Sequence, residues 1–183
     1  FLISHQPSSL LPTIKSRCLK INLPNHNYDN FSNIIEISNN DINEETKKFL
    51  YDITNGSPGL INEYEFDEIL NIFERLINLI EDKDPFSESN NDTIKFLSSL
   101  DNDQLKIFLS FIKFILITIN KIKLGINITK NYLSDSVLKI QTISDKISLD
   151  IIQRKLDYLI NNENDLFTFN LDKKIFMINF ITE

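Results

Sequence analysis

Basic and polar side chains that could act on a phosphate lie near the start of the chain. Lys15, Arg17 and Lys20 form a basic cluster in a chain whose formal net charge is −7. An arginine guanidinium is planar and permanently charged, so it can stabilise charge that develops on a transferring phosphoryl group. His5 precedes the cluster and follows the first apolar run of the chain. The simpler alternatives are a solvated loop for the cluster and a solvent hydrogen bond for His5.

The elements expected to position these side chains are two short strands joined by a loop. Residues 1–4 are apolar, and residues 18–23 alternate between apolar and polar types (Cys-Leu-Lys-Ile-Asn-Leu). Such alternation predicts a strand with one buried face. A polar loop at residues 6–9 and a short apolar turn at residues 10–15 lie between the two strands. Pro24 ends this unit, because proline cannot continue a ladder of backbone hydrogen bonds.

The next part of the chain predicts helices alone, from the spacing of its apolar residues. Helices are expected over residues 28–37 and 41–54. The Asn-Gly pair that follows the second helix suits a left-handed cap, and the next proline suits the first turn of a third helix. These features predict a three-helix unit that ends near Tyr64.

A second helical unit is expected to fill the rest of the chain. Its helices around Lys113 and Ile175 are apolar nearly all round, so we expect both to lie at the centre of a bundle. Asp92 suits the N-cap of a short helix, which would follow a polar loop. The predicted helices of this unit cover residues 66–81, 93–100, 101–123, 132–143, 148–161 and 166–182, with the loop at residues 84–91. The expected fold class is therefore mainly α.

Composition narrows the class of protein. The chain is 42% hydrophobic and contains fourteen Phe, which is enough apolar surface for a core and excludes a disordered protein. Its acidic balance argues against wrapping a nucleic-acid backbone, because phosphate binding needs a basic face. A single cysteine excludes an intramolecular disulfide and fits a reducing cytosol. The longest apolar run, residues 108–119, is well short of the roughly 20 residues that a membrane span needs.

No complete active site is expected from the remaining polar residues. Neighbouring carboxylates such as Glu44 and Glu45 are typical of helix ends rather than of acid–base pairs. His5 and His26 lack the spacing of a metal-ligand pair, so no metal site is expected. The sequence contains no Gly-x-x-x-x-Gly-Lys-Ser/Thr phosphate loop.

Two stretches resemble motifs of the clamp-loader ATPases of the AAA+ class. Residues 13–18, Thr-Ile-Lys-Ser-Arg-Cys, resemble the motif that closes the nucleotide-binding core in that family. The preceding Leu11-Pro12 is similar to bacterial delta-prime-type subunits of DNA polymerase III. Further along the chain, residues 56–59 (Gly-Ser-Pro-Gly) resemble a motif in the lid of those subunits.

The resemblance implies a role for each residue of the first motif. Arg17 would be an arginine finger that acts in trans on ATP held by an adjacent motor subunit. Thr13 and Ser16 would support the loop that carries it, and Cys18 would pack in the core. His5 falls near the sensor position at the end of the first strand, where the resemblance implies a polar side chain that could orient a γ-phosphate or an attacking water. An ordinary surface position in a basic turn is the alternative for Arg17.

The lid motif, Gly56, Ser57, Pro58 and Gly59, separates two kinds of subunit. Motor subunits of the family carry an arginine at the position of Gly59, where it touches bound ATP as a second sensor. A glycine there favours the non-motor, delta-prime type, because that phosphate contact is missing. A simple helix–turn–helix at residues 56–59 is compatible with both types.

The resemblance also implies a domain organisation. Residues 1–24 would be the end of an AAA+ α/β core with two short strands. Residues 25–65 would form a three-helix lid, and residues 66–183 would form a helical collar that holds an oligomeric ring together. The phosphate-binding elements would precede Phe1, so ATP and Mg²⁺ would be bound by neighbouring subunits and no cofactor is expected in this chain.

The implied function is support of ATP-dependent loading of the sliding clamp during DNA replication. The expected partners are tau/gamma motor subunits and the delta subunit, with the sliding clamp and primed DNA reached through the assembled complex. The expected location is the cytoplasm, without membrane contact. The alternatives are a tau/gamma-type motor ATPase subunit and a non-catalytic helical adaptor.

Overall fold

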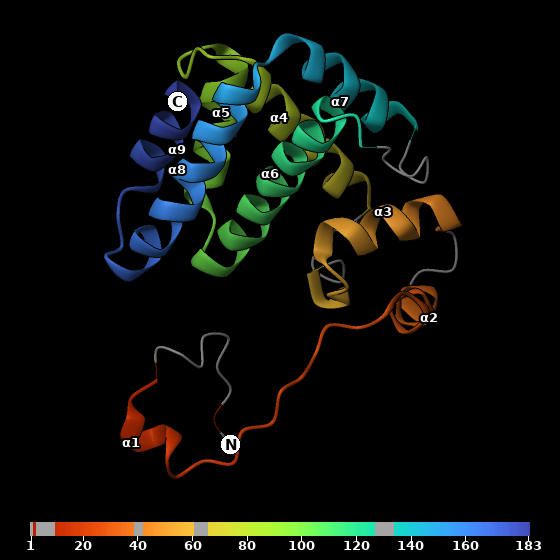
Figure 1. The fold of residues 1–183 in the computed structure, drawn as a ribbon, viewed down its shortest axis with the longest axis vertical. Coiled ribbons are helices and arrows are strands. Elements are labelled where there is room, and N and C mark those ends of the chain that lie inside the picture. Colours follow the sequence, from red (N-terminus) through yellow and green to blue (C-terminus); the bar gives the residue numbers. More distant parts are fainter. Residues whose placement is uncertain (1, 3–9, 39–41, 61–65, 127–133) are drawn as a thin grey trace.

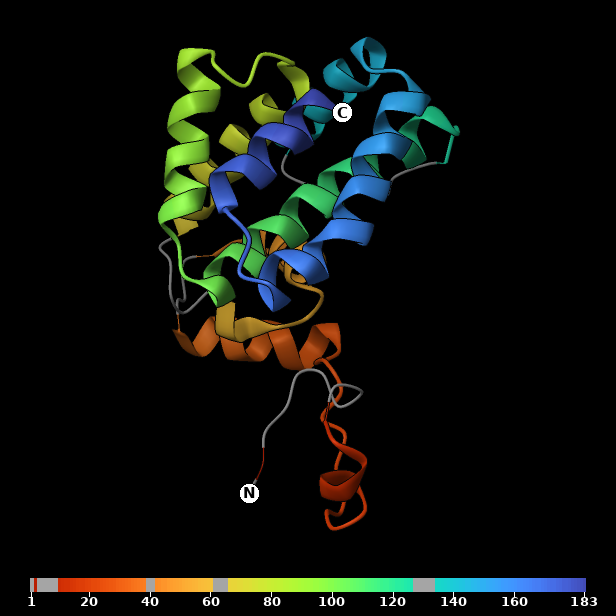
Figure 2. The same cartoon turned by 90° about the vertical axis from the view of Figure 1, so that its left-hand side faces the viewer.

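The computed structural model describes residues 2, 10–38, 42–60, 66–126 and 134–183. Within these residues the protein is helical and contains no strand, which confirms the mainly α class. Figures 1 and 2 show a helical body and, set apart from it at the amino-terminal end, the single-turn helix α1 (Pro12–Lys15).

The first helices of the body follow the expected spacing. Helix α2 spans Tyr28–Ser38, and α3 spans Glu44–Thr54 with Asn43 as its N-cap, whose side chain accepts a hydrogen bond from the Thr46 N–H at 2.8 Å. Asn43 satisfies one of the free amides that every helix start leaves. The predicted third helix is a short 3₁₀ turn, η2 (Pro58–Leu60), within the described residues.

The next three helices carry the middle of the chain. Helix α4 covers Phe66–Glu81 as predicted. Helix α5 covers Glu88–Ser99, so the loop predicted at residues 84–91 was too long and the Asp92 cap was wrong. Ser87 is the N-cap, because its hydroxyl accepts from the Asn90 N–H. Helix α6, Asn102–Lys123, begins at a capping box between Asp101 and Gln104.

The last three helices are α7 (Ser134–Lys146), α8 (Leu149–Thr168) and α9 (Lys173–Thr182). Helix α8 runs further than predicted, and the chain turns through Asn170, whose φ is +51°. Ile175 in α9 is exposed, so the central position predicted for this helix was wrong. Its Phe176, Met177, Phe180 and Ile181 are buried, while its other face meets solvent.

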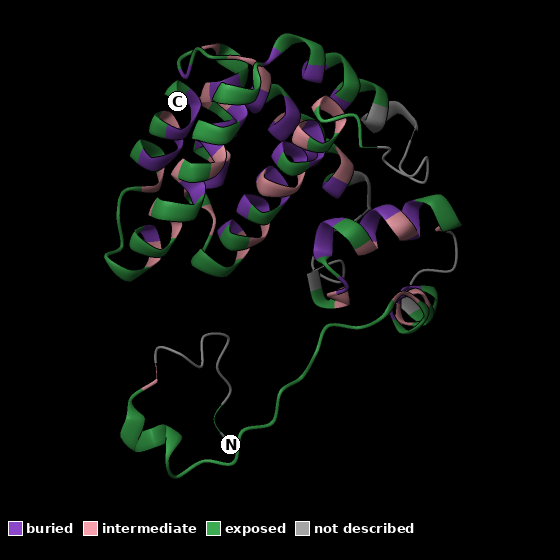
Figure 3. Cartoon of the chain, viewed as in Figure 1, coloured by how far each residue is buried: buried purple, intermediate pink, exposed green. Residues whose placement is uncertain are grey.

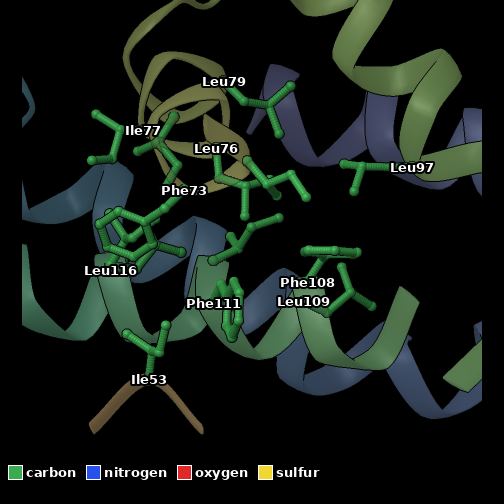
Figure 4. Close-up of a cluster of buried hydrophobic side chains, with 14 of the residues drawn as sticks. Ile53, Phe73, Leu76, Ile77, Leu79, Leu97, Phe108, Leu109, Phe111 and Leu116 are labelled. Carbon is green, nitrogen blue, oxygen red and sulfur yellow. The ribbon is translucent and has the colours of Figure 1, made fainter. Parts of the chain in front are cut away.

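Helix α6 lies at the centre, as predicted for the helix around Lys113. It packs against α3, α4, α5, α7 and α8. Figure 4 shows Phe108, Phe111 and Leu116 of α6 in one cluster with buried side chains of α4. Lys113, near the middle of α6, forms an ion pair with Glu163 of α8. The carboxylate balances the charge of this lysine.

A buried aromatic contact joins α3 to the rest of the core. The ring of Phe49 in α3 meets the ring of Phe73 in α4 edge to face, with centroids 5.0 Å apart. Phe73 also lies 6.4 Å from the ring of Phe114 in α6. Buried apolar side chains therefore run without a break from α3 into α4 and α6, across the boundary predicted between residues 65 and 66.

Polar groups of α8 hold α9 in its place. The buried Lys155 donates to the carbonyl oxygens of Phe180 and Ile181, each at 2.8 Å, and its Nζ lies 4.8 Å from the Phe180 ring centroid. The Tyr158 hydroxyl donates to the Phe176 carbonyl at 3.1 Å. Lys155 thus supplies donors to carbonyls in the last turn of α9, where the helix leaves them without backbone partners.

Residues 11–27, called the arm below, extend away from the helical body. Figure 3 shows the arm exposed along its described length, and every residue from 11 to 27 is exposed. The strand predicted at residues 18–23 is not formed, and its apolar face is open, with Leu19 90% and Leu23 89% exposed. A strand needs a neighbour to bond its backbone, and none of the described residues provides one. The other predicted strand, residues 1–4, lies outside the described residues except for Leu2.

Candidate functional site

The arm brings four of the predicted site residues into one turn. Pro12 starts α1, and the Ser16 hydroxyl donates to the Thr13 carbonyl at 3.2 Å. The N–H of Arg17 donates to the Ile14 carbonyl at 3.1 Å, which continues the turn past the helix. Proline fits the first helical position because the missing N–H has no partner there in any case. The turn therefore sets the backbone at Arg17 and leaves its side chain exposed.

Cys18 and His5 differ from expectation in different ways. Cys18 follows Arg17 in the same turn and is exposed, so the prediction that it packs in a core was wrong for this chain. The physical reason is that no described element covers the arm at this point. His5 lies outside the described residues.

Charge is distributed unevenly between the arm and the body. Residues 1–28 carry three of the nineteen Lys and Arg side chains and none of the twenty-six Asp and Glu side chains. The helical body is therefore strongly acidic, while the arm is basic. An exposed arginine in such surroundings is attracted to anionic groups, and acidic residues of its own segment do not neutralise it.

The Gly-Ser-Pro-Gly motif lies in the helical body, close to His26. This is the end of the arm that joins α2, and Arg17 lies towards the other end. Gly56 has φ +75° and its N–H donates to the Tyr51 carbonyl at 2.9 Å, which ends α3 in the left-handed cap predicted from the sequence. The Ser57 N–H donates to the Thr54 carbonyl at 3.2 Å. The structure does not bring this motif into contact with the turn at Arg17.

The close approach of His26 to Gly56 was missed at the sequence level. A Cβ added to Gly56 would lie 2.5 Å from the His26 carbonyl oxygen and 3.1 Å from the Tyr51 ring. A glycine after an asparagine indicates a left-handed cap, but the pattern carries no sign that a distant backbone segment passes over it.

Gly59 differs from Gly56 because the fold does not require a glycine there. It is exposed, and an added Cβ would meet nothing within 4 Å. We expect Gly59→Arg to change the free energy of unfolding by no more than about 0.5 kcal/mol, as for other surface substitutions. Urea unfolding followed by circular dichroism measures this. A loss of more than about 2 kcal/mol would show that the position has a packing role.

Two further features of the described residues bear on the kind of site. No group of three or more His, Cys, Asp or Glu side chains is arranged to hold a metal ion in the part of the chain that the structure describes. A groove of about 260 Å³ lies between α4 and α7 and is lined by Ile77, Leu138 and Thr142 among others. Ion pairs Lys139–Glu74 and Lys146–Glu81 join the same two helices, so we interpret the groove as part of their packing.

None of the helices in the described ranges is both long enough and apolar enough to cross a bilayer. Comparisons with protein-family models, with curated proteins and with solved structures found no match to this chain.

Proposed function

We propose that this chain belongs to a non-motor, delta-prime-type subunit of a bacterial DNA polymerase III clamp loader. In this role Arg17 is an arginine finger that stabilises the phosphates of ATP bound by the adjacent tau/gamma motor subunit. The observation that carries the proposal is the exposed Arg17 at the end of the Thr-Ile-Lys-Ser-Arg-Cys turn, on an arm that projects from the body. A guanidinium that serves another chain has to be exposed in its own chain.

The open apolar face of the arm supports the same proposal. Leu19, Ile21 and Leu23 alternate with polar residues, and all three are exposed. In the proposed protein, residues 1–24 are the end of an AAA+ α/β core, and its sheet covers these side chains. Apolar side chains of this number are costly to leave in water, which favours a covering surface.

The helical body supports the rest of the assignment. Helices α2 and α3 with η2 correspond to the lid, and α4 to α9 correspond to the collar that joins the ring of motor and delta subunits. Gly59 gives the lid no side chain for a phosphate contact. In the proposed complex the neighbouring subunits bind ATP and Mg²⁺, and the assembled ring opens the sliding clamp and loads it on primed DNA in the cytoplasm.

The test of this function is a reconstituted clamp loader that contains the full-length protein. Arg17→Ala is compared with Lys20→Ala, which removes one positive charge from the same exposed arm. We expect clamp-stimulated ATP hydrolysis to fall in Arg17→Ala, because one ATP site of the ring loses its stabilising cation. We expect the complex that contains Lys20→Ala to hydrolyse ATP at the rate of the unsubstituted complex.

Arg17→Lys adds a second control, since lysine keeps the charge but lacks the planar fork of donors. We expect it to restore only part of the lost hydrolysis. Equal rates in the Arg17→Ala and unsubstituted complexes, with both rings intact by gel filtration, would contradict the finger and favour the non-catalytic helical adaptor.

A further inference from the structure

We infer that Gly56 is a positioning residue that fixes the direction in which the arm leaves the helical body. The carboxyl-terminal end of the arm meets the body. At this end the backbone of His26 passes over the left-handed turn that follows α3. The inference rests on the proposed function only in naming Arg17 as the side chain that is thereby positioned. The contact itself stands on the geometry of the turn.

The space at Gly56 is filled by the base of the arm. Gly56 is buried, and its missing side chain leaves room for the His26 carbonyl oxygen, which an added Cβ would approach to 2.5 Å. That oxygen is backbone, so it cannot turn aside as the end of a flexible side chain could. Any side chain at residue 56 would therefore move either the α3 turn or the base of the arm.

Aromatic rings of α2 and α3 also pack together beside the contact between His26 and Gly56. The ring of Tyr51, which borders Gly56, meets the rings of Tyr28 and Phe31 edge to face, with both centroid distances 5.4 Å. The Tyr28 hydroxyl donates to the Glu44 carboxylate at 2.8 Å. The first residues of α2 are thus fixed to α3 just after the arm ends.

The helix that receives the arm starts at the junction as well. The side chain of Asn27 accepts from the Asn30 N–H at 3.0 Å, and its carbonyl accepts from the Phe31 N–H at 3.0 Å. Only Asn27 therefore separates His26 from the first residue of α2. The backbone between the Gly56 turn and α2 is consequently short and has little freedom to move. Movement of the turn that contains the Gly-Ser-Pro-Gly motif would carry the arm with it.

The chain offers a matched set of glycines to test this. Gly56→Ala adds a methyl group at a positive φ and against His26. Gly125→Ala adds one at a φ of +71° with nothing within 4 Å, and Gly59→Ala adds one in open space. Gly125→Ala therefore reports the backbone strain of alanine at positive φ without the contact.

The measurement is a distance between the arm and the body. Cys18 is the only cysteine and is exposed in the arm, and Gln153 is exposed on α8. Nitroxide labels at Cys18 and at Gln153→Cys give the distance distribution by double electron–electron resonance. We expect a shift or broadening of this distribution in Gly56→Ala, and the unsubstituted distribution in Gly59→Ala and Gly125→Ala.

Three results would overturn the inference. They are an unchanged distribution in Gly56→Ala, an equal change in Gly125→Ala, and a distribution in the unsubstituted chain that is too broad to define one direction of the arm. If Gly56→Ala does not fold by circular dichroism, Tyr51→Leu replaces it. This substitution removes the ring beside Gly56 without backbone strain, and an unchanged distance would then be decisive against the inference. The distance measurement does not depend on ATP. If Arg17→Ala had no effect on ATP hydrolysis, the proposed function would be contradicted, but the inference about Gly56 would still be tested by the distances.

Discussion

Replacing Phe73 by alanine should lower the free energy of unfolding by about 3–5 kcal/mol. Phe73 is fully buried in α4, and its ring contacts Phe49 of α3 and Phe114 of α6. Its loss removes apolar surface from the core and leaves a cavity that three helices line, so the site cannot close without moving all of them. Urea unfolding followed by circular dichroism gives the value.

Phe86→Ala is the matched control for this prediction. Phe86 is 76% exposed in the turn between α4 and α5, so the same chemical change should alter stability by no more than about 0.5 kcal/mol. The same unfolding curves show whether α2 and α3 unfold together with the other helices. Because Phe73 joins α3 to the core, we expect a single unfolding transition, and we expect its urea midpoint to be lower in Phe73→Ala. Equal stabilities of the two alanine variants would show that the contact between α3 and α4 is not part of the folded core.

Lys155→Met should give the second large effect, and its size should depend on pH. At pH 7 we expect a loss of about 1–3 kcal/mol, because the carbonyls of Phe180 and Ile181 lose their donor. Methionine fills a similar volume, so the cavity contribution is small. Lys174→Met on the exposed face of α9 is the control and should be nearly neutral.

The pH dependence follows from the burial of the Lys155 ammonium. Burial lowers the pKa of Lys155 to about 8, from an ordinary value of 10.5; Lys83 and Arg154 lower it further, and Glu183 opposes them. Between these two values the unfolded chain binds more protons than the folded chain, so the stability due to Lys155 rises with pH. It is fully present above the unfolded pKa and is lost as the pH falls through the folded pKa. The gain corresponds to about 3 kcal/mol.

The measurement is urea unfolding of the unsubstituted chain and of Lys155→Met at several pH values from 7 to 10. Other groups titrate in this range, but they are common to both chains and cancel in the difference. We expect the stability difference between the two chains to widen towards pH 10. A difference that stays constant or narrows would mean that the Lys155 pKa is not lowered in the folded chain.

Helix positions were predictable where the sequence carries both a periodic apolar face and an end signal. Helix α4 shows both, and its bounds match the prediction. The left-handed cap at Asn55 and Gly56 was also confirmed, and the predicted helix start at Asp101 agrees with a capping box that the structure shows there. These signals act within one or two helical turns, so the local sequence is sufficient to define them.

Prediction failed where two nearby end signals compete, and where the outcome depends on distant parts of the chain. Helix α5 starts earlier than predicted, because the Asn90 side chain donates to the carbonyls of Asp82 and Asp84 and so ties a polar stretch to the loop before it. Helix α9 is apolar nearly all round, yet only one face is covered. Apolar composition predicts a buried helix but does not show how many neighbours are available to cover it.

The candidate site shows the same division between local and distant causes. The turn that carries Arg17 follows from Pro12 and the Ser16 hydroxyl, which act within a few residues. Residues 18–23 have the alternation of a strand, but a strand needs a neighbour that the described residues do not supply. Nothing local to Gly56 indicates that His26 passes over it. The role of Arg17 in trans stays a prediction.

The exposed arm also determines where proteases would cleave the protein first. Trypsin-like enzymes cleave after Lys15, Arg17 and Lys20, where no packing protects the backbone. Lysines within α6 or α8 become cleavable only after their helices open. Brief digestion would therefore sever Arg17 from a body that stays folded. In the proposed full-length subunit the sheet of the AAA+ core covers the apolar face of this arm, so cleavage at the same three sites would be slow there. Rapid cleavage of the full-length protein at these sites would show that the arm stays uncovered.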